Sequence, residues 1–378
     1  MKLTRQFLDF FHSEKAGGMV LIICTIFSLM AANLFPGAVY TELWNINLGG
    51  HPLQHWINDG LMTVFFLMIG LELEREIYSG ELSEFKNASL PLLAALGGML
   101  VPAGLYLIIN INTSTQPGAG IPMATDIAFA IGILSLLGSR VPASLKVFLT
   151  ALAVIDDLGA ILVIAFFYTA SLAWSDLLAA LGIFGLLLVF NRLKINQIFP
   201  YLIGGSLMWY FMLHSGIHPT ITGVLLAFAI PFGDGGDKSP SYRLQHFLHR
   251  PVAFIILPLF ALANTGILIG SNMQSGLIEP SSIGIFIGLI VGKPLGIWLF
   301  SKAGVWLRFC ALPPDLIWKH IAGAGFLGGI GFTMSIFITL LAFNKETLVD
   351  QTKIAVLIAS AIAGIIGFFW LRKTLPDQ

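Results

Sequence analysis

The sequence predicts an all-α, polytopic membrane protein with twelve transmembrane helices, organised as inverted repeats and containing two discontinuous helices. Apolar residues make up 56% of the 378 residues, whereas Asp, Glu, Lys and Arg together contribute 11%. A soluble domain carries about 25% charged residues. Apolar runs long enough to cross a bilayer recur along the whole chain, and the basic residues between them alternate from side to side.

Twelve apolar segments follow one another along the chain. With the N-terminus placed in the cytoplasm, 17 of the 20 Lys and Arg residues fall in cytoplasmic regions, two in outer loops and one, Lys293, within a span. Because basic residues concentrate in cytoplasmic loops, this asymmetry predicts twelve spans with both termini cytoplasmic. The segments cover about residues 17–35, 56–72, 89–110, 121–138, 147–168, 176–190, 199–213, 217–231, 252–269, 282–300, 321–342 and 354–371.

Segments 4 and 11 contain residues that interrupt helices. Segment 4 reads GAGIPMATDIAFAIG, with Pro122 and the polar pair Thr125 and Asp126 inside a short run. Segment 11 carries five glycines between Gly323 and Gly331, and glycine at this density weakens a helix. Unwound backbone is tolerated at membrane depth only where protein or a water-filled cavity satisfies it. The two segments are therefore predicted to be discontinuous.

The positions of the two interrupted segments indicate an internal symmetry. They are the middle members of segments 3–5 and 10–12. Interrupted segments in corresponding places of two halves are typical of transporters with inverted repeats and a site at the midplane. We therefore expect repeats at about 89–168 and 282–371 within a single integral membrane transporter domain, residues 1–378. The alternative is that the glycines only permit close helix packing.

Two adjacent acids, Asp156 and Asp157, occupy the middle of an otherwise uncharged span. Each carboxylate at that depth costs about 2.5–3.5 kcal/mol on insertion scales, so such residues indicate a site for cations or protons. Neighbouring residues on a helix point about 100° apart. One acid can therefore line an ion path while the other pairs with Lys293. The alternative is an ion-pair cluster that only locks the bundle, but with Asp126 three acids face one lysine.

An excess of buried carboxylates provides a place where a proton and a cation compete. Small hard cations such as Na⁺ and Li⁺ take oxygen ligands from carboxylates, hydroxyls, carbonyls and water. Thr125, beside Asp126, suits a ligand role. If the same carboxylates bind either ion and the site faces one side at a time, exchange of the two ions follows.

At these residues the chain resembles the NhaA-type sodium/proton antiporters of bacterial inner membranes, over essentially its whole length. The resemblance implies that Asp126 and Asp157 bind the cation and protons with Thr125 nearby, and that Asp156 is the partner of Lys293. It also implies ten core helices, with segments 4 and 11 crossing as extended chains, and electrogenic exchange that is activated at alkaline pH. The matching stretches are WINDGLMTVFFLMIGLELEREIYSGEL, ATDIAFAIG, LTALAVIDDLGAILVIAFFYT, SGIHPTITGVLLAF, LPLFALANTGI and GKPLGI.

The resemblance also implies a group of residues that respond to pH. The acids and the base of the GLELERE stretch share one helix face, since they are three and four positions apart. Gln245 departs from the family pattern, which has a glutamate beside the histidine, so a neutral amide replaces a group that titrates. The expected pH-response residues are Glu72, Arg75, Glu76, His218, His246 and His249.

The expected partners are Na⁺ or Li⁺, protons and the lipid bilayer, without any cofactor. A net charge of zero excludes a basic surface for nucleic acid. The outer loop between segments 1 and 2 alternates weakly and contains Gly49 and Gly50, which favours a hairpin. The family uses a hairpin here as a dimer contact, so we expect a homodimer through residues 36–55. The alternative is an ordinary surface loop.

Other classes of membrane protein fit the sequence less well. Intramembrane aspartyl proteases combine YD with GxGD, and neither pattern surrounds Asp126 or Asp157. Prenyl-transfer enzymes need a further aspartate, which DDLGA lacks. We therefore predict that the chain is not an enzyme. A sodium-coupled symporter of related architecture is the main alternative, but it requires no lysine within the membrane. A channel suits the two interrupted segments least.

Overall fold

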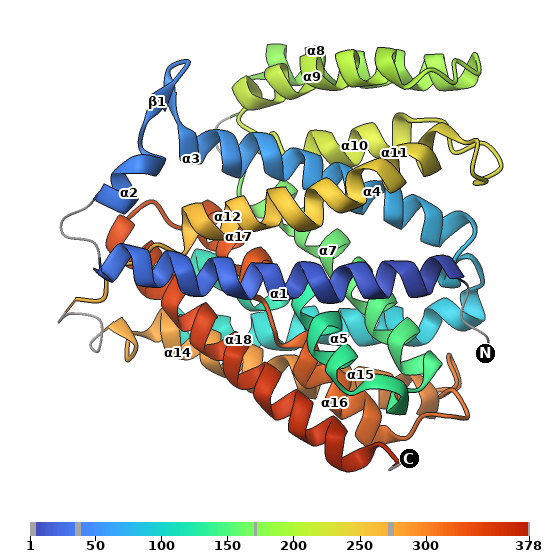
Figure 1. The fold of residues 1–378 in the computed structure, drawn as a ribbon, viewed down its shortest axis with the longest axis vertical. Helices are drawn as coiled ribbons and strands as arrows, with labels where there is room; N and C mark the ends of the chain where they lie inside the picture. Colours follow the sequence, from blue (N-terminus) through green and yellow to red (C-terminus); the bar gives the residue numbers. More distant parts are fainter. Residues whose placement is uncertain (1–4, 35–38, 170–171, 271–275, 377–378) are drawn as a thin grey trace. The chain divides into compact units, whose positions relative to one another are not determined.

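The computed structural model describes residues 5–34, 39–169, 172–270 and 276–376, and most of these residues are helical (Figure 1). The chain divides into two compact units. Unit 1 consists of Met1–Leu34, Glu84–Ala160 and Thr265–Gln378, and unit 2 consists of Phe35–Ser83 and Ile161–Asn264. The single transporter domain over residues 1–378 stays a prediction.

Unit 1 contains the first long helix, the last long helix and the two interrupted segments. The last helix has Glu346 in its first turn and Arg372 and Lys373 in its last, so its charges complement the helix dipole. The elements of this unit are α1 (Arg5–Leu34), α5 (Phe85–Ile109), η3 (Gln116–Met123), α6 (Ile127–Leu136), η4 (Gly138–Arg140), most of α7 (Ala143–Phe167), α14 (Pro280–Ile287), η6 (Gly288–Gly292), α15 (Lys293–Trp306), α16 (Trp318–Gly328), α17 (Phe332–Ala342) and α18 (Glu346–Thr374).

Unit 2 contains a small hairpin and a group of helices of unequal length. Two of its helices, α8 and α9, pack side by side (Figure 1). Its elements are α2 (Val39–Trp44), β1 (Asn47–Leu48), β2 (His51–Pro52), α3 (Leu53–His55), η1 (Trp56–Leu61), α4 (Met62–Tyr78), η2 (Glu81–Ser83), α8 (Trp174–Arg192), α9 (Ile198–Ser215), α10 (Ile221–Ala229), α11 (Pro240–Pro251), η5 (Val252–Ile256) and α12 (Leu257–Asn264).

Judged by helix length and apolar composition, the described part of the chain has fewer helices that could cross a membrane than the sequence predicts. Within the described part of the chain, nine helices are long and apolar enough to cross a bilayer, or ten if the bent pair α16 and α17 counts as one span. Helix α10 has nine residues, whereas about 20 are needed to span. The protein is a mostly helical membrane protein, and the count of twelve spans stays a prediction.

The outer loop after segment 1 forms the expected hairpin. Asn47 pairs with Pro52 and Leu48 with His51 in antiparallel register. Gly49 and Gly50 have φ values of 62° and 93°, and such a two-residue turn needs positive φ at both positions. The hairpin prediction is confirmed, although residues 36–38 of the proposed dimer loop lie outside the described residues.

The close packing of α5 against α15 sets the position of the intramembrane lysine. A Cβ atom on Gly97 would lie 2.2 Å from the carbonyl oxygen of Gly296, and one on Gly296 would lie 2.1 Å from that of Gly97. The two backbones therefore meet where neither residue has a side chain. Lys293 begins α15 less than one turn before this contact.

Each of the two interrupted segments consists of two helical pieces joined by non-helical backbone. In the first, η3 ends at Met123 and α6 begins at Ile127, and Ala124 between them is extended, with φ −82° and ψ 153°. In the second, α16 ends at Gly328 and α17 begins at Phe332, with a bend of 48° between them. Whether these pieces cross the membrane as extended chains stays a prediction.

Candidate functional site

Unit 1 contains a buried lysine at the start of α15. Lys293 is completely buried and directly follows the π-helical stretch η6. The backbone N–H of Lys293 donates to the carbonyl of Gly288, the first residue of η6. Pro294 has no N–H, so the regular helical ladder is interrupted here as well. Such π-helical turns occur frequently at functional sites. The local sequence GKPLG thus places a single ammonium group at an irregular point of the helix.

Asp156 on α7 is the ion-pair partner of this lysine. Lys293 Nζ lies 2.9 Å from Asp156 Oδ2, and both side chains are fully buried. The ammonium also donates to the carbonyl oxygen of Met123, at the end of η3. Thr125 Oγ1 lies 2.7 Å from the same carboxylate oxygen and 2.9 Å from the carbonyl oxygen of Gly328. The pair therefore connects α7 and α15 with residues at both breaks.

Asp126 has a different set of partners. Its Oδ1 accepts from the N–H of Phe129 at 3.1 Å and so caps α6, which is a typical role for aspartate at a helix N-terminus. Its Oδ2 accepts from the N–H of Thr333 at 3.1 Å and from the Thr333 hydroxyl. Its own N–H donates to the carbonyl of Ile330 at 2.7 Å. The carboxylate therefore lies between the N-terminal ends of α6 and α17.

Asp157 is the third buried acid of unit 1. Its side chain is 1% exposed, and its charge acts on Lys293. Since the position differs from Asp156 by one residue on α7, the two carboxylates point in different directions. Asp126, Asp156 and Asp157 are thus three buried carboxylates of unit 1, and the buried Lys293 is paired with one of them. Hard cations prefer carboxylate oxygens of this kind as ligands.

The structure divides the predicted cation-binding residues into two sets. Thr125 was expected beside Asp126 as a ligand, but its hydroxyl is directed to Asp156. Sequence reasoning missed Thr333, which binds Asp126 with both its N–H and its hydroxyl. The only sequence signal for Thr333 is its place two residues after Gly331, at the start of a helical piece. The roles of these residues in ion binding stay predictions.

Most of the expected pH-response residues gather in unit 2, where α4 meets α11. The side chain of Gln245 on α11 faces the carboxylate of Glu72 on α4. The guanidinium of Arg75 lies 5.4 Å from the centre of the Tyr242 ring, and this ring stacks on His246 at 4.7 Å. The residue that departs from the family pattern is thus in direct contact with the first acid of the cluster.

His218 lies apart from this cluster. Its Nε2 is 3.1 Å from the carbonyl oxygen of Tyr168, and it faces Asp59 of η1. Asp59 in turn binds His55 at 2.9 Å. Because Asp59 and Glu72 are separated by 13 positions of a continuous helical segment, they are about 20 Å apart along its axis. Any response of His218 to pH is therefore separate from that of the α4–α11 residues.

Sequence comparison identifies relatives over the full chain. A protein from Flavobacterium psychrophilum described as Na(+)/H(+) antiporter NhaA is 65% identical over 377 residues, which covers 100% of this chain and 98% of that protein. Na(+)/H(+) antiporter NhaA 1 from Flavobacterium johnsoniae is 66% identical over 378 residues, covering 100% and 99%. Na(+)/H(+) antiporter NhaA from Dechloromonas aromatica is 61% identical over 374 residues, covering 98% and 96%.

A solved structure shares the fold. The sodium proton antiporter MjNhaP1 from Methanocaldococcus jannaschii, determined at pH 8, superimposes with a TM-score of 0.54 at 14% identity and covers 98% of this chain and 100% of its own. The model of the family described as Na+/H+ antiporter 1 matches residues 8–371. With this match and relatives above 60% identity over the full length, the chain belongs to the Na⁺/H⁺ antiporter family.

Proposed function

We propose that this protein is a secondary active transporter that exchanges cytoplasmic Na⁺ or Li⁺ for external H⁺ at a midplane aspartate site. One observation carries the proposal. Asp126, Asp156 and Asp157 are buried together with Lys293 in the unit that holds both interrupted segments. Carboxylates at membrane depth are costly and indicate an ion path, and one lysine neutralises only one of the three.

Asp157 and Asp126 are the groups proposed to carry the transported ions. Lys293 and Thr125 both bind Oδ2 of Asp156, so this acid is already compensated. The negative charge that is left belongs to Asp126 and Asp157, and either a proton or a sodium ion can compensate it. Since one sodium ion displaces protons from two carboxylates, more protons than sodium ions move in each cycle, which makes the exchange electrogenic.

Alternating access follows from the position of the carboxylates beside the two breaks. Asp126 is hydrogen-bonded to residues 330 and 333 of the second interrupted segment. Rocking of one inverted repeat against the other about such a site is the usual motion of transporters with broken helices. We infer that the site opens to the cytoplasm and to the outside in turn, and that sodium and protons bind in alternate half-cycles.

The α4–α11 cluster is proposed to regulate exchange by pH. It brings the carboxylates of Glu72 and Glu76 together with Arg75, and His246 stacks on Tyr242 beside them. Histidine is the side-chain type whose ordinary charge change falls between mildly acidic and alkaline conditions. Loss of protons from the cluster is inferred to activate the transporter.

The proposed setting is the inner membrane of a bacterium, with both termini in the cytoplasm. The distribution of Lys and Arg supports this orientation. A homodimer through residues 36–55 is proposed because the hairpin of β1 and β2 presents both of its strands to solvent. Trp56 Nε1 donates to the Leu48 carbonyl at 2.8 Å and holds the hairpin against its own chain.

The decisive test is sodium-driven collapse of a pH gradient in sealed vesicles, measured from mildly acidic to alkaline pH. We expect wild-type protein to exchange Na⁺ for H⁺, and Asp157→Asn to be inactive although it is inserted and folded. Asp176→Asn, on α8, is a matched control that should remain active. Wild-type exchange in Asp157→Asn would refute the proposed site, and a requirement for an organic anion would favour a symporter.

A further inference from the structure

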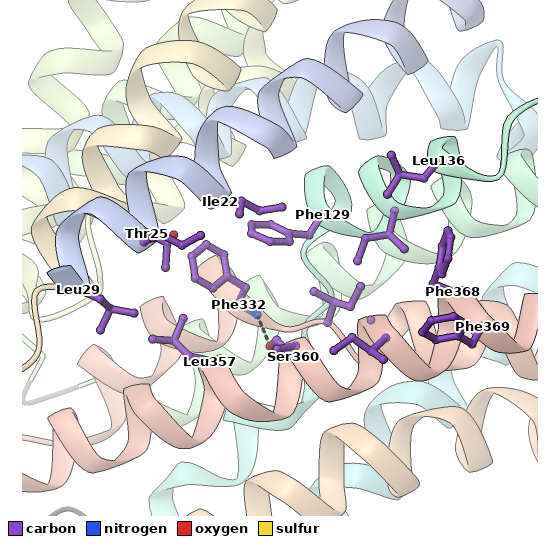
Figure 2. A pocket seen from close by; sticks show the side chains of 16 residues that line it. Ile22, Thr25, Leu29, Phe129, Leu136, Phe332, Leu357, Ser360, Phe368 and Phe369 are labelled. Carbon is purple, nitrogen blue, oxygen red and sulfur yellow. Dashed lines mark hydrogen bonds between the residues drawn. The ribbon is translucent and has the colours of Figure 1, made fainter. Parts of the chain in front are cut away.

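An apolar groove runs along unit 1 between α1, α6 and α18, and it plays no part in the proposed ion path. Its volume is about 470 Å³, within the range of about 300–1,000 Å³ that is usual for ligand sites. Figure 2 shows Leu29 and Leu357 at one end and Leu136, Phe368 and Phe369 at the other. All three helices belong to segments that are long and apolar enough to cross the membrane. The groove therefore lies between segments that are expected to cross the hydrocarbon region.

The two hydroxyl groups that line the groove are bound within the protein. Thr25 Oγ1 donates to the carbonyl of Leu21 at 2.8 Å. Ser360 Oγ accepts from the N–H of Phe332 at 3.1 Å, as the dashed line in Figure 2 shows. The rest of the lining is aliphatic or aromatic. A polar or charged ligand would find no partner here, whereas a hydrocarbon chain loses nothing by entering.

One end of the groove carries positive charge. Phe369 lies one turn before Arg372 and Lys373, which are exposed in the last turn of α18. In Figure 1 the N-terminal end of α1 and the C-terminal end of α18 lie toward the same side. In the proposed orientation this is the cytoplasmic side, where the membrane surface is rich in anionic lipids that attract basic residues next to a span.

We propose that this groove binds an anionic diacyl phospholipid of the inner leaflet, with one acyl chain between α1, α6 and α18 and its phosphate beside Arg372 and Lys373. The charge complementarity at one end and the continuous apolar lining along the rest select this occupant. The acyl chain contacts Ile330 and Phe332, which flank Gly331 in the second break. Both side chains are at most 2% exposed, so they separate the lipid from the polar backbone of the break.

Photochemical labelling tests the proposal on the full-length protein. The protein is reconstituted in phosphatidylcholine vesicles that contain a trace of phosphatidylglycerol with a diazirine in its acyl chain. After irradiation, adducts are mapped by mass spectrometry. We expect them to concentrate on peptides of α1, α6 and α18, and we expect unlabelled phosphatidylglycerol, but not phosphatidylcholine, to compete. Adducts spread evenly over all lipid-facing helices, or equal competition by both lipids, would overturn the proposal.

Variants at the wall of the groove separate a specific site from general lipid contact. Ala361→Phe places a ring in the groove and should reduce labelling there several-fold. Ile362→Phe, at the next position of α18 and outside the lining, is the matched control and should leave it unchanged. Ala361→Leu is a smaller filling for use if the larger variant does not fold. Unchanged labelling in a folded Ala361 variant would refute the site.

The basic end is tested in the same way. The double variant Arg372→Gln and Lys373→Gln should abolish the preference for phosphatidylglycerol over phosphatidylcholine. The double variant Lys238→Gln and Arg243→Gln removes two exposed basic residues of unit 2 and should keep that preference. Absence of lipid adducts in the groove, together with crosslinks between two copies of α18 when the same vesicles are treated with a bifunctional protein crosslinker, would show that a second protein chain covers the groove and would overturn the proposal. Because labelling measures lipid and not transport, its outcome is independent of the proposed exchange.

Discussion

Removal of the buried ammonium group should destabilise the protein through the acid that it leaves behind. In Lys293→Ala, Asp156 Oδ2 keeps only the Thr125 hydroxyl, because the ammonium at 2.9 Å is gone. Asp156 Oδ1 accepts no hydrogen bond from any described residue. Breaking a buried pair from one side costs about 3–5 kcal/mol, because the other charge stays buried and uncompensated. We expect Lys293→Ala to lower the Tm by several degrees.

The reverse change should cost less. In Asp156→Asn the amide oxygen still accepts hydrogen bonds, and the ammonium keeps the carbonyl oxygen of Met123. Combining the two substitutions removes both charges, so the double variant should be more stable than Lys293→Ala alone. Groups in direct contact show coupling energies of about 0.5–3 kcal/mol in such cycles.

The cycle is measured by thermal unfolding of the four proteins in the same detergent. Lys302→Ala is the control, since this lysine lies on the same helix α15 but is exposed and rests over the Trp298 ring. The decrease in Tm of Lys302→Ala should be clearly smaller than that of Lys293→Ala. Purely additive losses for Lys293→Ala and Asp156→Asn would show that the two charges do not stabilise each other, and the reasoning would fail.

Four further substitutions test ion binding and regulation. Asp157→Asn should abolish exchange in sealed vesicles with an unchanged Tm, because the amide cannot take up a proton or compensate Na⁺; retained exchange would contradict its role. Asp126→Asn should raise the Na⁺ concentration at which exchange is half-maximal. Thr333→Val removes one donor to Asp126 and should raise this concentration less. The same sodium dependence in wild type, Asp126→Asn and Thr333→Val would place Asp126 outside the ion path. Gln245→Glu should move the pH-activation curve toward alkaline pH at an unchanged maximal rate, because a second carboxylate facing Glu72 opposes the loss of protons from the α4–α11 cluster. An unmoved curve at saturating Na⁺ would show that this contact does not set the pH response.

Local patterns in the sequence predicted several elements well. The uncharged run around Asp156 predicted the long helix α7, and the pair of glycines after Leu48 predicted the hairpin. Pro122 and the glycines up to Gly331 lie next to two stretches of non-helical backbone, while the two discontinuous transmembrane helices stay a prediction. In each case the relevant physics acts within a few residues, through helix propensity or a positive φ.

Contacts between distant parts of the chain could not be predicted from local patterns. Thr333 binds Asp126 across 207 positions, and no spacing rule connects them. Thr125 could not be assigned to Asp156 because the non-helical backbone on either side determines where its hydroxyl points. The prediction of twelve spans relied on apolar segments and on the distribution of Lys and Arg, neither of which reveals that α10 has only nine helical residues.

The hydrogen bond from the Asp126 N–H to the Ile330 carbonyl makes the two breaks a single mechanical joint. At membrane depth a lost backbone bond would have to be replaced by another protein group or by water in a cavity, so this bond holds the two interrupted segments together at this point. The aspartate at this joint also supplies one of the buried charges. Under the proposed exchange, a change of the ionic partner of Asp126 would therefore act directly where the two interrupted segments meet, without a relay of intermediate residues.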